Sequence, residues 1–287
     1  YKNIAHPTQT GSYLYPWVRL HALRDYYSMA ALVAAHPGVH LTINLTPSLI
    51  WQIEDYTERG ATDRALDLTL KPAEALVAAE RKFILENFFE AHWHHQIATH
   101  PRYSDLFLQR REGREFTMQD LRDLQMWFNL AWFGREFRES EVKLVTGETA
   151  SVRRFVEQGR NYNVADIEAM VEEQYKLMRA VLPLHRQLQA QEQIEVSTSP
   201  FFHPILPLLI DTDRATIDRP PERHRDTASR RPSTTAPRAM PEVPPAPLLQ
   251  AATAALRLQT SRFPRETVYS FGSAMPLRLI IGIAATR

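Results

Sequence analysis

Several chemically capable side chains lie within one apolar segment, Gln193-Ile-Glu-Val-Ser-Thr-Ser-Pro-Phe-Phe-His-Pro-Ile-Leu-Pro-Leu-Leu209. Glu195 offers a carboxylate, three consecutive hydroxyl residues begin at Ser197, and His203 adds an imidazole. The pattern predicts a short buried strand that ends in a loop carrying the carboxylate, the hydroxyls and the imidazole, and such strand ends are where α/β proteins hold their ligands. Polar groups among apolar neighbours cost free energy unless something hydrogen-bonds to them. A ligand rich in hydroxyl groups, such as a sugar, would be a suitable partner.

Other side chains are open to two interpretations. Asn44, at the end of an expected strand, could orient a loop or contact a ligand. Trp17 and His21 share a helical face, whereas Arg19 between them does not, and core packing explains that face as well as ligand binding does. Core packing is the preferred interpretation for the aromatic residues Trp127, Trp132 and Phe133, although such rings could also stack on sugars.

A histidine-rich segment, His92-Trp-His-His95 with His100 nearby, raises the question of a metal site. On a helix His92 and His95 would share a face and His94 would not, and no carboxylate or cysteine is placed to complete a tetrahedral set. A solvated or interfacial helix end is the favoured interpretation, so we expect no metal and no organic cofactor. For Asp211 and Asp213 we favour a structural role over ligand binding.

The elements around these residues suggest an α/β protein. Residues 13–35 have apolar positions at helical spacing, and Pro37-Gly38 ends that helix. Residues 39–45 alternate as a strand does, and Pro47-Ser48 opens the next helix.

Residues 48–191 are expected to be almost entirely helical, and the second strand covers residues 193–199. Thr117 and Asn163 are expected N-caps, each followed by an acid in the first turn. An insertion of about 140 residues is too long for a simple crossover, so it suggests a helical subdomain, at about residues 50–191, over one face of a barrel or sheet. The long amphipathic stretches are residues 72–98, 117–133, 142–159 and 164–191.

The composition changes after Asp213. Residues 214–247 are rich in Arg and Pro and contain no aromatic residue, which predicts disorder. Residues 248–287 stay unassigned, apart from an expected short helix at 248–258. A role of this segment as a nucleic-acid tether is disfavoured, because acidic residues lie among the Arg residues. A second hypothesis is that the tail results from translation of GC-rich DNA in a wrong reading frame, which the coding DNA would test.

Four segments in order carry a family resemblance: residues 11–27 (Gly-Ser-Tyr-Leu-Tyr-Pro-Trp-Val-Arg-Leu-His…), 36–49, 127–133 and 193–213. Together they resemble glycoside hydrolase family 57, the α-amylase/amylopullulanase-like group, over residues 1–213. The resemblance implies a distorted (β/α)7 barrel and a retaining attack on an α-glycosidic bond. Such chemistry uses two carboxyl groups about 5–5.5 Å apart. Glu195 and His203 match a family motif and are expected substrate contacts, together with Asn44 and Ser197.

The chain departs from the family pattern at the reacting groups. The family's His-Gln-Pro motif would precede Tyr1, and no Trp-Pro-Ser-Glu-Gly follows Asp213. Glu266 lacks that motif's neighbours, and no candidate acid/base Asp lies beyond it, so no catalytic residue is assigned. We therefore expect an inactive, incomplete barrel domain of an α-glucan hydrolase or transglycosylase. The alternatives are a non-catalytic carbohydrate-binding remnant and a non-functional gene fragment.

Composition adds broad limits. The chain has 287 residues, 44% hydrophobic and 23% charged, which is the balance of a soluble globular protein. A net charge of +1 offers no bulk attraction for nucleic acid. No apolar run approaches the roughly 18 residues of a membrane span, and the absence of cysteine suits the cytoplasm. We expect an α-glucan as the partner, with neither nucleic acid nor membrane.

Overall fold

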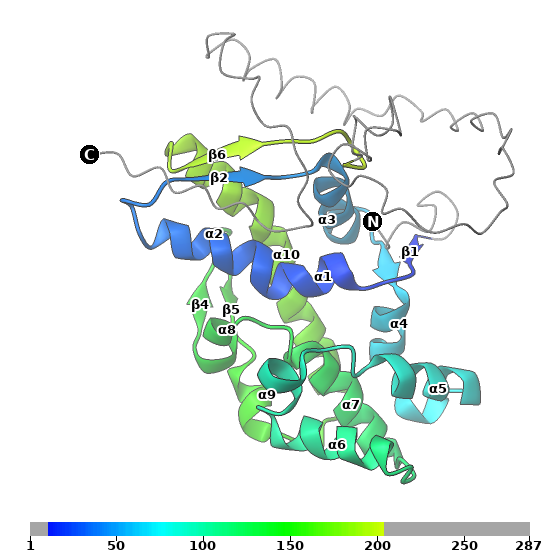
Figure 1. The fold of residues 1–287 in the computed structure, drawn as a ribbon. Coiled ribbons are helices and arrows are strands. Elements are labelled where there is room, and N and C mark those ends of the chain that lie inside the picture. The colour runs from blue at the N-terminus through cyan, green and yellow to red at the C-terminus, as the bar shows by residue number, and fades with distance from the viewer. Residues whose placement is uncertain (1–10, 204–287) are drawn as a thin grey trace, which may run out of the picture. The chain divides into compact units, whose positions relative to one another are not determined.

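The computed structural model describes residues 11–203 (Figure 1). The helix expected from residue 13 begins only at Trp17, because residues before it pair as a strand. Its middle turn widens into a π-helix, which the sequence did not predict. In order, the elements are β1 (Ser12–Tyr13), α1 (Trp17–His21), η1 (Ala22–Tyr26) and α2 (Tyr27–Ala34).

The two predicted strands are confirmed, and they pair with each other. β2 (Leu41–Asn44) and β6 (Ile194–Ser197) run parallel and side by side, although about 150 residues separate them in the chain (Figure 1). Their register sets Thr42 opposite Glu195 and Asn44 opposite Ser197. The helix α3 (Pro47–Glu58) follows β2 and has Pro at its first turn, as predicted.

The remaining strands are short. β3 (Thr62–Asp63) pairs in parallel with β1, and β4 (Val142–Lys143) pairs with β5 (Thr149–Ala150) in the antiparallel sense. Within residues 11–203 the sheets are therefore three pairs of strands. This mixed arrangement agrees with an α/β class, and a closed barrel stays a prediction.

Two of the four long predicted helices are wrong in detail. The helix expected at residues 72–98 is divided into separate helical elements. One of them begins after Val77, whose backbone N–H donates to the Glu80 carboxylate. Residues 142–150 form the β4–β5 hairpin, which turns at Gly147 with a φ of 88°. The helices from α4 onward are α4 (Arg64–Leu70), η2 (Ala73–Ala75), α5 (Ala78–Asn87), η3 (Trp93–Ile97), α6 (Pro101–Arg111), α7 (Met118–Leu130), α8 (Arg135–Glu139), α9 (Arg153–Gln158) and α10 (Val164–Ala190).

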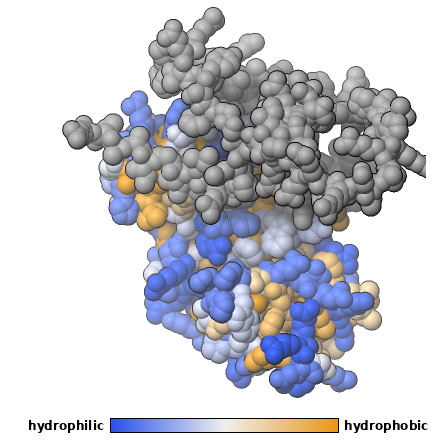
Figure 2. Space-filling model, in the orientation of Figure 1, coloured by the Kyte–Doolittle hydropathy of each residue, from blue (hydrophilic) through white to orange (hydrophobic). Residues whose placement is uncertain are grey.

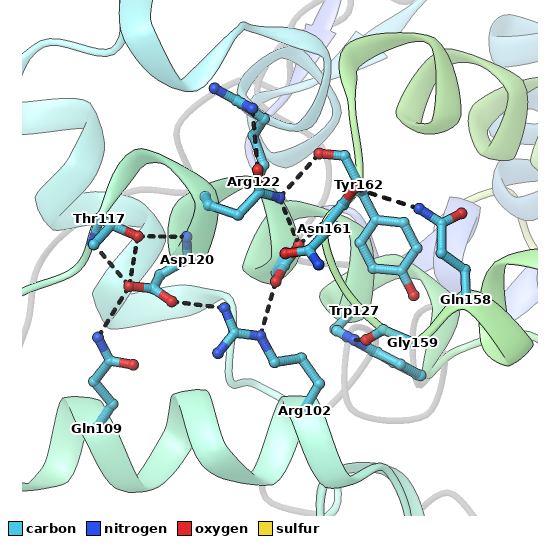
Figure 3. A network of polar contacts seen from close by, with 12 residues as sticks. Arg102, Gln109, Thr117, Asp120, Arg122, Trp127, Gln158, Gly159, Asn161 and Tyr162 are labelled. Atoms are coloured by element: carbon cyan, nitrogen blue, oxygen red, sulfur yellow. Dashed lines mark hydrogen bonds and ion pairs between the residues drawn. The ribbon is translucent and has the colours of Figure 1, made fainter.

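Both predicted N-caps are confirmed. The Thr117 hydroxyl accepts from the Asp120 backbone N–H, and the Asp120 carboxylate accepts in return from the Thr117 N–H (Figure 3). Asn163 and Asp166 do the same for α10. Arg102 of α6 donates to Asp120 over 2.6 Å and so ties α6 to the start of α7.

The long helix α10 organises the core. It contacts η1, α2, α3, α4 and α7, and it also contacts β6. In Figure 1 it passes beneath the β2–β6 pair. Among residues 11–203 the exposed large apolar side chains are spread along the sequence, and the described part of the surface visible in Figure 2 is mostly hydrophilic.

Some predictions fall beyond the residues that the structure describes. They concern the Arg/Pro-rich segment 214–247, residues 248–287, and the side chains Asp211, Asp213 and Glu266. Within residues 11–203, none of the helices has the length and apolar character needed to cross a membrane.

Candidate functional site

A row of polar side chains crosses the ends of the paired strands β2 and β6. The Thr42 hydroxyl donates to the Glu195 carboxylate over 3.2 Å. The Asn44 amide donates to the Ser197 hydroxyl over 3.2 Å, and the Ser199 hydroxyl donates to the Asn44 carbonyl oxygen over 3.2 Å. The structure thus brings three of the predicted contact residues, Glu195, Asn44 and Ser197, onto one face. We call Thr42, Asn44, Glu195, Ser197 and Ser199 the strand-end row.

The alternation of side chains along a strand explains this face. Ile43 and Ile194 point to the opposite face and are buried, while Thr42, Asn44 and Glu195 are exposed. The prediction of a buried strand at residues 193–199 is therefore right for the face that carries Ile194 and wrong for the face that carries Glu195, which is exposed. Glu195 also lies within the strand and not in the loop after it.

The loop after β6 is fixed by backbone contacts to the segment after β2. The Leu45 N–H donates to the Ser197 carbonyl over 3.0 Å, and the Ser48 N–H donates to the Phe201 carbonyl over 3.2 Å. The Thr198 hydroxyl donates to the Leu45 carbonyl over 3.1 Å. The row is consequently held by two anchored segments before any ligand arrives.

His203, the fourth predicted contact residue, is the last residue that the structure describes. It is exposed and has a φ of 52°, in the left-handed region that non-glycine residues rarely adopt. Its role as a substrate contact stays a prediction.

The aromatic candidates belong to the core. Trp127, Trp132 and Phe133 are all buried, as preferred from the sequence. Trp17 and His21 share a face, as predicted, and both rings lie against Trp132, with centroids 5.8 Å and 5.1 Å away.

The histidine-rich segment does not form a ligand set. His92 has an extended backbone and precedes the π-helix η3, so the predicted helical face does not include it. Its ring nevertheless stacks on the His95 ring with centroids 4.5 Å apart, and the His92 and His94 centroids are 6.0 Å apart. Within residues 11–203, no three potential ligands gather in a way that could hold a metal ion. His100 lies apart and accepts a hydrogen bond from Arg138 over 2.8 Å.

Two features were missed from the sequence. Thr42 completes the strand-end row, and the alternation of residues 39–45 already placed it on the same face as Asn44. Arg19 is fully buried and binds the Asp63 carboxylate with two nitrogens, over 2.7 Å and 3.2 Å. No local signal identifies that pair, because its members come from α1 and β3.

The Arg19 guanidinium is the centre of a buried polar network. Its Nη1 donates to Asn129 and to Gln174, each over 2.8 Å, and the Asp63 carboxylate also accepts from Tyr56 over 3.0 Å. Burial alone would lower the pKa of Arg19, but Asp63 outweighs burial and the pKa is raised. The network joins α1, α3, β3, α7 and α10, and so it stabilises the fold.

Comparison with known proteins identifies the family. The family model of glycosyl hydrolase family 57 matches residues 2–235, which is most of the chain. No curated protein and no solved structure matches. The matched residues include both segments of the strand-end row and the buried Arg19 network. The chain therefore belongs to glycosyl hydrolase family 57.

Proposed function

We propose that this chain supplies one wall of the sugar-binding cleft of a retaining α-glucan hydrolase or transglycosylase. The observation that carries the proposal is the strand-end row, where the Glu195 carboxylate, within β6, lies on the same face as the Asn44 amide and the Ser197 hydroxyl at the C-terminal ends of β2 and β6. Such ends are the usual position of ligands in α/β proteins. Family membership makes a carbohydrate the natural ligand.

The roles of the individual groups follow from their chemistry. The exposed Glu195 carboxylate accepts hydrogen bonds from sugar hydroxyls, while Asn44 can both donate and accept. Ser197 is held by Asn44, which keeps its hydroxyl within the row. His203 follows in the same matched segment and would donate to a sugar oxygen.

The row binds and does not cleave. A retaining hydrolase needs a nucleophile and an acid/base carboxyl about 5–5.5 Å apart, and among the described residues the row has one carboxylate, Glu195. The sequence contains no Trp-Pro-Ser-Glu-Gly motif for the nucleophile. We therefore expect the 287-residue chain to bind maltooligosaccharides without turnover.

Calorimetric titration with maltooligosaccharides, paired with a sensitive assay for reducing ends, tests both parts of the proposal. Glu195→Ala and His203→Ala should each weaken binding about tenfold, as expected for the loss of one hydrogen bond to the ligand. Glu168→Ala, which removes an exposed acid on α10, is the matched control and should bind normally. Absence of binding would refute the sugar-binding wall, and retaining hydrolysis by the wild type would refute the loss of chemistry.

A non-catalytic carbohydrate-binding protein is the second candidate, and it predicts the same calorimetry. The observation that favours it is the single carboxylate of the row in a chain without the nucleophile motif. The coding DNA separates the two. A Trp-Pro-Ser-Glu-Gly segment in another frame after codon 214 would favour the enzyme, and its absence would favour the binding protein.

A further inference from the structure

A pocket of about 330 Å³ lies on one face of α6, and its walls are Phe107, Arg110 and Arg111. These residues occupy positions i, i+3 and i+4, which fall on the same side of a helix. Small-molecule pockets in proteins usually measure about 300–1,000 Å³, so this one has room for a single small ligand. It lies in the helical part of the chain and includes no residue of the strand-end row.

An aromatic cluster borders the apolar side of the pocket. The Phe107 ring packs against Trp93 of η3 with centroids 4.8 Å apart, and against Phe89 with centroids 5.6 Å apart. Trp93 is 37% exposed and is the most exposed of the five tryptophans of the chain, although tryptophan is highly buried on average. Trp93 and Phe107 therefore offer a planar apolar surface to a ligand.

Buried contacts hold this aromatic surface in place. The Gln96 side chain of η3 accepts from the His92 backbone N–H over 2.8 Å and donates to the Ala131 carbonyl over 3.1 Å. These bonds tie η3 to the end of α7. On the other side of the cluster, Phe89 stacks on the fully buried Tyr103 with centroids 5.6 Å apart. The surface is thus formed before any ligand binds.

The two arginines of the pocket carry positive charge that has no carboxylate partner. Arg110 and Arg111 are exposed, and within residues 11–203 neither guanidinium forms a hydrogen bond or an ion pair. The Arg110 guanidinium instead lies 5.5 Å from the centroid of the Phe89 ring, over the aromatic cluster. By contrast, Arg102 at the start of the same helix forms two ion pairs.

The acids closest in sequence do not balance these charges. Glu112 pairs with Arg114 over 2.7 Å. Asp105 precedes Phe107 by two residues, a spacing that places it on the other side of the helix. Two neighbouring guanidinium groups without acids attract an anion, and the charge that would balance them is left for a ligand to supply.

We propose that this pocket binds a small aromatic anion. Its planar ring packs on Trp93 and Phe107, and its carboxylate or phosphate group is held by Arg110 and Arg111. A guanidinium can donate two parallel hydrogen bonds to either kind of group. A neutral sugar would suit the rings but leave both positive charges unbalanced, so the ligand class differs from that of the strand-end row. The site does not depend on any glycosidase activity.

The ¹H–¹⁵N spectrum of the full chain tests the proposal through the indole N–H of Trp93, which Trp93→Phe assigns. Titration with sodium 2-naphthoate should shift this resonance saturably and leave that of the buried Trp127 in place. The neutral analogue 2-naphthamide, and acetate, which lacks the ring, should each bind at least tenfold more weakly. A parallel titration with 2-naphthyl phosphate identifies the preferred anionic group as the one that binds more tightly.

Arg110→Gln and Arg111→Gln should each weaken the binding of 2-naphthoate at least fivefold. Both side chains are exposed, so both variants should fold as the wild type does. Arg153→Gln is the matched control, since it removes an exposed arginine from α9 and should leave the titration unchanged. A Trp93 resonance that stays fixed, equal affinity for 2-naphthoate and 2-naphthamide, or wild-type binding by both pocket variants would overturn the proposal.

Discussion

The strand-end row and the Arg19 network use similar side chains in opposite surroundings. Around Arg19 the carboxylate, amides and tyrosine hydroxyl are almost fully excluded from water, and each of the central groups is hydrogen-bonded. In the strand-end row, Thr42, Asn44 and Glu195 are exposed, and the three side-chain contacts within the row are all 3.2 Å long. The groups around Arg19 are buried and hydrogen-bonded to one another, whereas the exposed groups of the strand-end row can form further hydrogen bonds with a ligand.

On this difference we base the distinction between structural polar groups and the proposed binding groups. A buried charge pair loses hydration that only its partners replace, so removing one partner is costly. An exposed carboxylate keeps its water and can exchange it for sugar hydroxyls at little cost. The type of a polar residue therefore says little about its function. Its burial, and whether all its donors and acceptors are already hydrogen-bonded, say much more.

The largest expected effect is on the buried network. Arg19→Met should destabilise the protein by about 3–5 kcal/mol, because it leaves Asp63 charged and buried without its partner. Chemical denaturation followed by circular dichroism measures this. The double variant Arg19→Met/Asp63→Asn should recover part of the loss, since the amide oxygen can still cap α4 through Leu66.

An exposed arginine serves as the control for that experiment. Arg153→Met breaks the surface pair with Glu157 on α9 and should change stability by no more than about 0.5 kcal/mol. Equal effects of the two arginine substitutions would contradict the distinction between buried and exposed polar groups.

A smaller effect concerns pH. Burial, aided by Arg138, lowers the pKa of His100 from 6.5 to about 4. Between these values the unfolded chain binds a proton that the folded chain does not, so His100 makes the protein less stable as the pH falls from 6.5 to 4. His100→Gln keeps an acceptor for Arg138 but does not titrate.

The difference in unfolding free energy between wild type and His100→Gln, measured at pH 7.5 and pH 4.5, isolates this contribution. The wild type should lose more stability than the variant. His36→Gln, an exposed histidine change, is the control and should follow the wild type. Identical pH dependence of the wild type and His100→Gln would show that the imidazole is not the buried neutral base that its surroundings imply.

Local signals predicted local structure well. The caps at Thr117 and Asn163, the proline at the start of α3 and the alternation in β2 each act within a few residues, and each prediction is confirmed. The β4–β5 hairpin was missed although its signals were also local, a Thr-Gly turn between β-branched residues. The apolar spacing of residues 142–159 also fits a helix, and it therefore predicted the wrong element at β4 and β5.

What could not be predicted depends on contacts between distant segments. The pairing of Thr42 with Glu195 requires the register of two strands about 150 residues apart. The burial of Arg19 depends on residues from four elements that meet only in the folded state. The matched family segments identified residues of the candidate site, but the sequence could not say which of them are exposed.

The smallest expected effect on stability lies at the strand-end row, and it is the sharpest test of the comparison. Glu195→Gln keeps the size of the side chain and an acceptor for Thr42, and the residue is exposed, so unfolding free energy should change by no more than about 0.5 kcal/mol. Binding of maltooligosaccharides should nevertheless weaken, because a neutral amide accepts hydrogen bonds less strongly than a carboxylate. Denaturation and calorimetry on the same variant measure both quantities. A large loss of stability with unchanged binding would instead place Glu195 with the structural polar groups, beside Arg19.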